Sequence, residues 1–284
     1  MASIALVANR GSGSGAVAPD EVEARLEALG ASVVAFDRAD ARQAAASGAD
    51  RVALAGGDGS VGPVAAAAGA TGVPLALIPV GTANNFGRAA GVPEELQRAC
   101  VLAARGEHLR PMELGRAGEL PFVNLASAGL APVAAIRAER LKRVLGSQAY
   151  TVGAAAAALR TPPLECRVKA GEKTVFAGRT WQAMVAVSGA FGSGVRVEAA
   201  EAGDGKLDLV VVEADARWRL LGHAYRMRER RVVAERTRGI LHERAVAFDI
   251  DVPAATPFNV DGEVIELGRT RFTIERAGFQ LVVG

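Results

Sequence analysis

The chain has 284 residues, half of them hydrophobic, and its 33 lysines and arginines nearly balance its 31 aspartates and glutamates. This length and composition predict a globular protein with one large domain or two smaller ones, and the small net charge argues against a general nucleic-acid-binding protein. Cys100 and Cys166 belong to no CxxC pattern, and the three histidines have no metal-ligand spacing. We therefore expect neither a disulfide framework nor a zinc site.

Two segments bear on localisation. Met1-Ala2-Ser3 runs directly into apolar residues without a basic region, which argues against a signal peptide. Residues 59–87 contain no charge, but prolines and glycines interrupt them, whereas a membrane-spanning helix needs about 20 mostly apolar residues. We expect a cytoplasmic protein that can contact the inner face of a membrane peripherally.

Short apolar strands alternate with helices in the first hundred residues. The expected strands are 3–8, 31–36, 51–55 and 74–79, and the expected helices are 19–29, 42–47, 61–68 and 93–105. This alternation predicts an α/β fold with a doubly wound parallel sheet, helices covering both faces. In such a sheet, ligands bind beyond the carboxyl ends of the strands.

Three polar loops rich in glycine follow three of these strands, so we expect all three loops at one edge of the sheet. They contain Gly11-Ser12-Gly13-Ser14-Gly15, Gly56-Gly57-Asp58-Gly59-Ser60 and Gly81-Thr82-Ala83-Asn84-Asn85. The first loop lacks the Gly-Lys-Ser/Thr ending of a Walker A loop and the G-x-G-x-x-G spacing of a dinucleotide fold. A plain flexible turn is the alternative there, and Asp37, which is suited to binding a ribose, leaves a dehydrogenase open.

The second and third loops contain more than a turn or a cap requires. An Asp-Gly pair is enough for a tight turn, yet three glycines surround Asp58 and a hydroxyl follows. A carboxylate in this setting suits Mg²⁺, which binds one or two carboxylates together with substrate phosphates. In the third loop one asparagine is enough to cap a helix, which leaves the other polar groups for a ligand.

The pattern changes near residue 110, after which β-like segments dominate. The expected strands are 121–127, 165–168, 174–177, 181–187, 206–212, 245–251, 264–267 and 271–275, and the expected helices are 132–144, 149–159 and 216–231. We place an N-terminal α/β nucleotide-binding domain at residues 1–118, to which the last strand, about 276–284, can return. A C-terminal β-rich, largely antiparallel domain then occupies residues 119–275.

The three loops, in this order, resemble the diacylglycerol kinase catalytic family, which includes bacterial lipid kinases and sphingosine kinases. That family shows Asn-Pro-x-Ser-Gly, Gly-Gly-Asp-Gly-Thr and Gly-Thr-x-Asn-Asp-Phe-Ala-Arg. The matching segments here are Asn9-Arg10-Gly11-Ser12-Gly13, Gly56-Gly57-Asp58-Gly59-Ser60 and Gly81-Thr82-Ala83-Asn84-Asn85-Phe86-Gly87-Arg88. The resemblance continues in Phe122-Val123-Asn124, Asp204-Gly205-Lys206-Leu207-Asp208 and Asn259-Val260-Asp261-Gly262-Glu263. It covers most of the chain and implies a nucleotide domain joined to a lipid-substrate domain.

The resemblance also implies a function: an ATP- and Mg²⁺-dependent lipid kinase that transfers the γ-phosphoryl group to a lipid hydroxyl, as in diacylglycerol. It implies that residues of all three loops bind ATP: Asn9, Ser12, Gly56, Gly57, Gly59, Ser60, Gly81, Thr82 and Asn84. It implies Mg²⁺ at the catalytic Asp58, a structural magnesium at Asp204 and a catalytic general base at Glu263. A plain Gly-Asp-Gly turn is the alternative for Asp204. Asp261-Gly262 is a hairpin-turn signal, but such a turn does not require Glu263.

The chain departs from the family pattern at several positions. Asn85 replaces an aspartate, which removes a charge from the expected metal network. The other departures are Arg10 for proline, Ser60 for threonine, Glu113 for aspartate, and Ser188 and Glu198 where the family often has asparagine and proline.

Two alternatives to a lipid kinase stay open: a kinase of a soluble nucleotide such as NAD, and a non-catalytic nucleotide or lipid sensor with the same fold. The expected partner is a lipid with a free hydroxyl. Residues 217–238 contain eight arginines and two acids, so they suit either anionic lipid headgroups or a solvated face. A homodimer is equally open.

Overall fold

The structure is a computed structural model of the chain. It describes residues 2–8, 17–145, 160–187, 196–197, 203–214, 232–233 and 239–284. The chain forms two compact units. We call Met1–Leu114, Pro121–Val123 and Glu275–Gly284 the α/β unit, and Gly115–Leu120 with Asn124–Ile274 the β unit.

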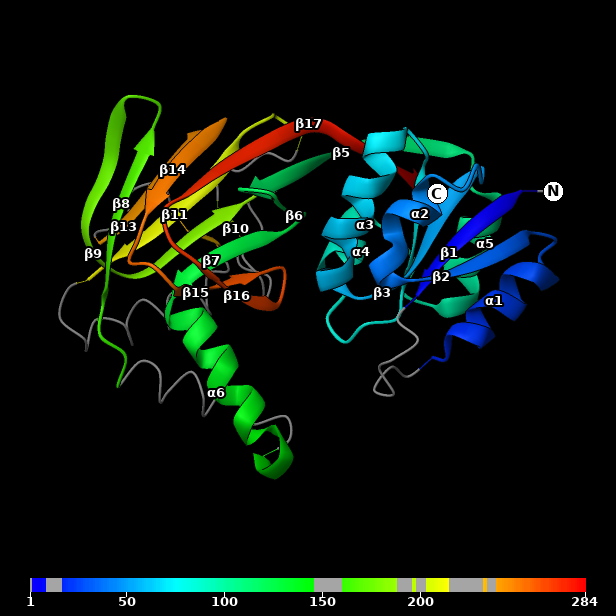
Figure 1. The fold of residues 1–284 in the computed structure, drawn as a ribbon, viewed down its shortest axis with the longest axis horizontal. Helices are drawn as coiled ribbons and strands as arrows, with labels where there is room; N and C mark the ends of the chain where they lie inside the picture. Colours follow the sequence, from blue (N-terminus) through cyan, green and yellow to red (C-terminus); the bar gives the residue numbers. More distant parts are fainter. Residues whose placement is uncertain are drawn as a thin grey trace. The chain divides into compact units, whose positions relative to one another are not determined.

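The α/β unit is built on a parallel sheet with the order β2-β1-β3-β4-β17 (Figure 1). Its strands are β1 (Ser3–Ala8), β2 (Ser32–Asp37), β3 (Arg51–Gly56), β4 (Leu75–Pro79) and the end of β17 (Thr270–Val283), where Leu281 pairs with Leu75. Its helices are α1 (Pro19–Ala28), the 3-10 turn η1 (Arg38–Asp40), α2 (Ala41–Ala45), α3 (Asp58–Thr71), α4 (Asn85–Ala90) and α5 (Leu96–Arg105).

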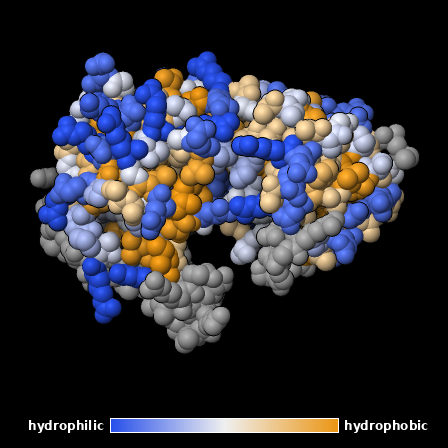
Figure 2. All heavy atoms as spheres, in the orientation of Figure 1, coloured by the Kyte–Doolittle hydropathy of each residue, from blue (hydrophilic) through white to orange (hydrophobic). Residues whose placement is uncertain are grey.

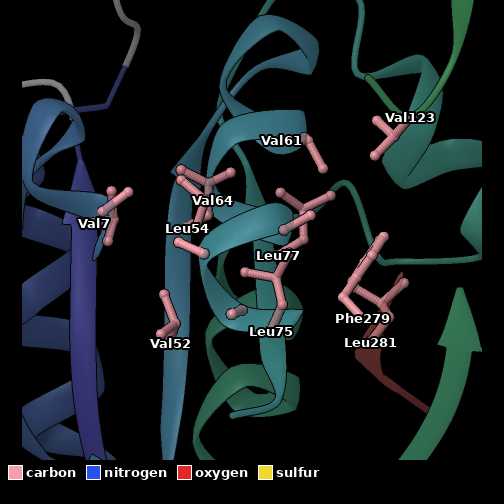
Figure 3. Close-up of a cluster of buried hydrophobic side chains, with 14 of the residues drawn as sticks. Val7, Val52, Leu54, Val61, Val64, Leu75, Leu77, Val123, Phe279 and Leu281 are labelled. Atoms are coloured by element: carbon pink, nitrogen blue, oxygen red, sulfur yellow. The ribbon is translucent and has the colours of Figure 1, made fainter. Parts of the chain in front are cut away.

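Both faces of this sheet are buried, because alternate strand residues enter two separate apolar clusters. Val52 and Leu54 of β3 pack with α2, α3 and α4 in one cluster (Figure 3). Ala53 and Ala55 pack with α1 and α5 in the other. A parallel strand that is buried on both faces must be apolar along its buried length, as β4 and residues 52–56 of β3 are. The predicted doubly wound parallel sheet is confirmed.

Helix α3 packs unusually closely through its glycines. A Cβ atom at Gly69 would lie 1.7 Å from the carbonyl oxygen of Gly278, and one at Gly62 would lie 2.6 Å from that of Pro121. Only glycine lets the helix approach these backbone segments. The helix ends at Gly72, whose φ of 74° is the left-handed conformation common at helix ends.

The β unit is mainly antiparallel, with the path β16-β15-β7-β9-β8-β14-β17 and with β11 paired between β9 and β13. Its elements are β7 (Leu125–Gly129), α6 (Leu130–Leu145), β8 (Leu164–Ala170), β9 (Lys173–Ala186), β10 (Arg196–Val197), β11 (Leu207–Glu213), β12 (Val232–Val233), β13 (Ile240–Ala245), β14 (Ala247–Asp251), β15 (Thr256–Val260), β16 (Glu263–Leu267) and the start of β17. Strands β5 (His108–Ala117) and β6 (Leu120–Phe122) have residues in both units. The predicted β-rich antiparallel domain is confirmed as a fold class.

Several element predictions were wrong in detail. Helix α3 begins at Asp58, three residues before the predicted start at residue 61, and α4, β5, β13 and β15 were not predicted. The two strands predicted at 174–177 and 181–187 are one strand, β9. The helices predicted at 149–159 and 216–231 lie outside the described residues. Within the described part of the chain, every helix is too short or too polar to span a bilayer.

Candidate functional site

The carboxyl ends of β1, β3 and β4 meet at one edge of the parallel sheet. Ala8 pairs with Ala55, and Gly56 pairs with Pro79, so the loops that follow begin at nearly the same level. The Val80 N–H donates to the Gly56 carbonyl oxygen at 3.2 Å. The first loop, with Asn9 and Ser12, lies outside the described residues, and the other two loops define the site that follows.

The second and third loops touch backbone to backbone at a pair of glycines. A Cβ atom at Gly81 would lie 2.5 Å from the Cα atom of Gly57, and one at Gly57 would lie 3.2 Å from the Cα atom of Gly81. Neither φ is in the left-handed region, so close approach is the reason for glycine at both positions. The contact brings the main chain of the two loops together at the rim of the sheet.

Asp58 joins the two loops. It is the first residue of α3, and its carboxylate accepts the backbone N–H groups of Asn85 and Phe86, both at 2.9 Å. Those two N–H groups begin α4, where helical N–H groups lack partners within the helix. A negative charge at the start of a helix also interacts favourably with the helix dipole. Asp58 is therefore an N-terminal cap supplied to α4 from another loop.

Asn84 shapes the third loop from within. Its φ of 49° is left-handed, and its side-chain amide donates to the carbonyl oxygens of Gly81 at 2.9 Å and Pro79 at 3.4 Å. It occupies the cap position of α4 but makes no capping hydrogen bond, since Asp58 does that instead. Its Oδ1 is buried and has no hydrogen-bond partner among the described residues. Thr82 and Asn85 are exposed on the same loop.

This edge has the features of an anion site. The start of a helix favours phosphate groups, and α3 begins here with Asp58, Gly59 and Ser60, all partly exposed. A carboxylate oxygen can accept more than one hydrogen bond, and Asp58 is the acidic side chain of the two loops at this edge. No group of three or more histidine, cysteine, aspartate or glutamate side chains suited to a metal occurs in the described residues. One carboxylate beside a helix start is a donor set that fits Mg²⁺ where substrate phosphates and water supply most of the ligands.

Glu263, the predicted base, lies in the β unit at the start of β16. It follows a two-residue hairpin turn in which Asp261 and Gly262 both have left-handed φ values, 47° and 98°, as in a type I′ turn. Glu263 pairs across the hairpin with Val260, and its side chain is exposed. The turn thus explains its two central residues and leaves the glutamate on the surface.

Asp261 has a structural function that its sequence motif did not reveal. Its side chain is buried, and Oδ1 accepts the N–H groups of Asn124 at 3.0 Å and Leu125 at 2.9 Å. The carboxylate therefore holds the start of β7 against the hairpin. The Asp-Gly pair signals the turn, but the two partners are more than 130 residues away, and no local pattern indicates them.

Asp204, the second predicted metal ligand, lies in a turn before β11. Its Oδ1 accepts the Lys206 N–H at 2.9 Å, and its Oδ2 forms an ion pair with Arg244. The same arginine lies beside Asp208, which is almost fully buried and within 2.8 Å of the Nε2 atom of His242. Sequence reasoning did not find this cluster.

Comparison with known families accounts for nearly the whole chain. Residues 3–117 match the model of the diacylglycerol kinase catalytic domain, and residues 124–282 match that of the YegS C-terminal NAD kinase beta sandwich-like domain. The chain belongs to the YegS and diacylglycerol kinase family. The predicted resemblance is therefore confirmed, and the chain is a member of a family of lipid-kinase-like proteins.

Relatives in this family align with different fractions of the chain. A Pseudomonas putida protein named "Probable lipid kinase YegS-like" is 44% identical over 111 residues, which is 38% of this chain and 37% of that protein. A Pseudomonas aeruginosa protein of the same name is 40% identical over 41% of this chain and 40% of its own length. A Shewanella frigidimarina protein of that name is 27% identical over 85% of this chain and 79% of its own length. The chain thus aligns with about two fifths of the first two relatives.

Solved structures show the same fold. A diacylglycerol kinase from Bacillus anthracis matches with a TM-score of 0.76 and 20% identity over 99% of this chain and 97% of its own. An NAD kinase from Archaeoglobus fulgidus, solved in complex with ATP, is more distant, with a TM-score of 0.53 and 13% identity over 99% of this chain and 93% of its own. The architecture of the YegS and diacylglycerol kinase family is therefore present in both units.

The structure brings together some predicted site residues of this family member. Gly56, Gly57, Asp58, Gly81 and Asn84 lie at one rim of the α/β unit. Glu263 and Asp204 lie in the β unit, and Asn9, Ser12, Ser188 and Glu198 lie outside the described residues. Glu113, expected as an aspartate in the family pattern, is buried in β5 of the α/β unit.

Proposed function

We propose that this protein is an ATP-dependent lipid kinase that transfers the γ-phosphoryl group to a hydroxyl of a diacylglycerol-like lipid. The supporting observation is the rim where Gly57 and Gly81 meet and Asp58 bridges the two loops, in a chain that both family models match. A main-chain surface at a helix start accommodates phosphates, since glycine leaves the N–H groups accessible.

In this proposal each loop has a defined task. Backbone N–H groups at Gly57 and Gly59 and the Ser60 hydroxyl bind phosphate oxygens, together with Asn9, Ser12 and Thr82. Asp58 holds Mg²⁺ through water and keeps α4 in place. The ion, when bound, neutralises charge on the phosphates. Catalysis in such transfers is mostly positioning and electrostatics.

Glu263 acts as the general base that takes the proton from the lipid hydroxyl. The exposed position of its side chain at the start of a hairpin strand is compatible with contact to a bulky substrate. The next residue, Val264, is one of the exposed large hydrophobic residues of the protein. Figure 2 shows further apolar surface over β7, β16 and the start of α6 in the same unit, which suits an acyl chain.

The partners and location follow from the same proposal. The substrate is a lipid with a free hydroxyl, and peripheral contact with the inner face of a membrane brings the enzyme to it. The arginine-rich stretch 217–238 is the candidate membrane contact. Only residues 232–233 of this stretch are among the described residues.

Incubation with labelled ATP, Mg²⁺ and a panel of diacylglycerol, sphingoid bases and polyprenols tests the proposal. We expect label in one lipid class, and a rate loss of at least about 100-fold in Glu263→Gln, since a positioned base contributes about 10²–10⁴. Glu263→Gln should still bind ATP, whereas Asp58→Ala should lose both transfer and tight ATP binding. Circular dichroism controls for folding.

Other outcomes identify the alternatives. Full turnover by either folded variant would remove that residue from the mechanism. Label in NAD rather than in lipid would favour the soluble-nucleotide kinase, with which the fold similarity to the Archaeoglobus protein is consistent. ATP binding without any transfer would favour the sensor, a possibility raised by Asn85 in the position of a family aspartate.

A further inference from the structure

The cluster around Arg244 in the β unit shows how this chain neutralises two carboxylates near a turn. Asp208 of β11 lies directly opposite Arg244 of β13 in the antiparallel pairing. Arg244 Nε is 3.6 Å from Asp208 Oδ1, and its Nη2 pairs with Oδ2 of Asp204, four residues earlier in the chain. His242, two residues from Arg244 on the same face of the strand, places Nε2 2.8 Å from the same oxygen of Asp208.

Burial makes a cation necessary at this position. The Asp208 side chain is 1% exposed and that of Asp204 is 19% exposed. Two carboxylates removed from water beside each other are strongly unfavourable unless a positive charge lies between them. Proteins meet this need either with a divalent ion held by oxygen ligands or with a guanidinium, whose planar fork suits carboxylates.

The residues present fit the second solution and not the first. Mg²⁺ requires near-octahedral oxygen ligands at about 2.1 Å. Oδ1 of Asp204 already accepts the Lys206 N–H, and Oδ2 already pairs with Arg244. A divalent ion bound to Oδ2 would lie against the guanidinium and be repelled by it. The magnesium that the family resemblance implies at Asp204 therefore competes with a charge built into the chain.

We infer that the guanidinium of Arg244 takes the place of a structural divalent cation at Asp204. The turn at residues 203–206 and the register of β11 with β13 are then independent of metal. This inference concerns the β unit and does not rest on the proposed kinase activity.

Thermal unfolding of the full chain without nucleotide tests the inference. We expect the same midpoint in EDTA and in excess Mg²⁺ or Ca²⁺, within about 1 °C, whereas a structural ion at a hundred times its Kd would raise it by about 5–10 °C. A rise with either ion that Asp204→Asn abolishes would show a metal at Asp204 and overturn the inference.

Substitution of the arginine gives the second arm. Arg244→Ser should lower the midpoint by at least about 5 °C in EDTA, because it removes the guanidinium that pairs with Asp204 and lies beside the buried Asp208. Added Ca²⁺ or Mg²⁺ should recover part of that loss in this variant alone. The matched control is Lys173→Ala, which removes the exposed ion pair with Glu243 of the same strand and should cost under about 2 °C.

Two results of this second arm would contradict the inference. One is an Arg244→Ser variant no less stable than Lys173→Ala, and the other is an equal rise with metal in the wild type. If Arg244→Ser does not fold, Arg244→Lys replaces it. This variant keeps the positive charge, so its midpoint should be as insensitive to metal as that of the wild type. It loses the planar guanidinium, so it should be less stable than the wild type. A rise in its midpoint of about 5 °C or more on adding metal would overturn the inference.

Discussion

Aspartate followed by glycine occurs in both units of this protein, and the two units use it differently. In the α/β unit, Asp58 lies on the partly exposed rim of the sheet, where its carboxylate accepts the first N–H groups of a neighbouring helix. In the β unit, Asp261 is buried in a hairpin turn and holds the start of another strand, while Asp204 pairs with a guanidinium. The dipeptide is the same, but the partners differ in each case.

The difference shows what stabilises each region. The rim of the α/β unit is held by close backbone contact at Gly57 and Gly81, with one carboxylate as a cap. The turns of the β unit are held by buried or partly buried carboxylates with distant partners. Removing a carboxylate should therefore lower the free energy of unfolding most in the β unit. Adding a methyl group should lower it most at the rim of the α/β unit.

The largest expected effect is that of Asp261→Ala. It leaves two backbone N–H groups without their acceptor, at about 1–3 kcal/mol each, and places alanine at a left-handed φ that costs roughly 1 kcal/mol more. We expect a loss of about 3–7 kcal/mol in the free energy of unfolding, measured by urea denaturation. Asp261→Asn keeps an acceptor and tolerates the turn, so it should lose less than half as much.

A partly exposed aspartate of the same unit is the control for this comparison. Asp249 pairs at the surface with Arg271, whose side chain is 63% exposed, so Asp249→Ala should change the free energy of unfolding by under about 1 kcal/mol. Equal stabilities for Asp261→Ala and Asp249→Ala would show that the Asp261 carboxylate is not a buried acceptor.

A smaller loss is expected when a methyl group is added at the rim of the α/β unit. Gly81→Ala puts Cβ 2.5 Å from the Gly57 backbone, which must move, at a cost of about 1–3 kcal/mol. Gly56→Ala should cost less, because its new neighbours are the side chains of Leu54 and Ser60 at 3.1 and 3.2 Å. Urea denaturation gives the order, and ATP titration should show weaker binding in Gly81→Ala.

The control for the rim is a glycine with space around it. A Cβ atom at Gly268 would meet only the Cα atom of Ala254 at 3.5 Å, so Gly268→Ala should be nearly neutral. If Gly81→Ala were equally neutral, the two loops would not be held by their glycine contact.

The sequence predicted the fold class because each unit has a strong local pattern. Apolar strands such as 51–55 are bounded by glycine loops, and this pattern predicts a buried parallel sheet. Strand β15 was not predicted, because a proline such as Pro257 argues against a strand. That proline pairs only with Glu266 of β16, outside the segment of β15 that pairs with β7.

The candidate site was only partly predictable for a related reason. Spacing after two neighbouring strands places Asp58 and the third loop at one edge, since parallel strands end together. Sequence cannot show that Asp58 caps α4, because the capping partners follow the next strand, 27 and 28 residues later. The Arg244 cluster was missed because its members come from two strands whose register only the folded sheet defines.

The smallest expected effect is on the rate at which the two buried thiols, one in each unit, react with a thiol reagent. Burial raises the pKa of Cys100 in the α/β unit, and it raises the pKa of Cys166 in the β unit to about 12. The thiolate is the reactive form, and a free cysteine has a pKa of about 8.5. Because a raised pKa favours the neutral thiol, the native protein should react slowly with a thiol reagent, with little increase between pH 7 and pH 9.

The same thiols then report which unit opens first. Gly81→Ala should speed labelling of Cys100 more than that of Cys166, and Asp261→Ala should do the reverse, with peptide mass spectrometry identifying the labelled cysteine. Wild-type protein is the control, and labelling in urea gives the rate for the exposed thiols. Equal acceleration of both thiols in both variants would mean that the two units open together, and the contrast between a backbone-held rim and charge-held turns would then not extend to local stability.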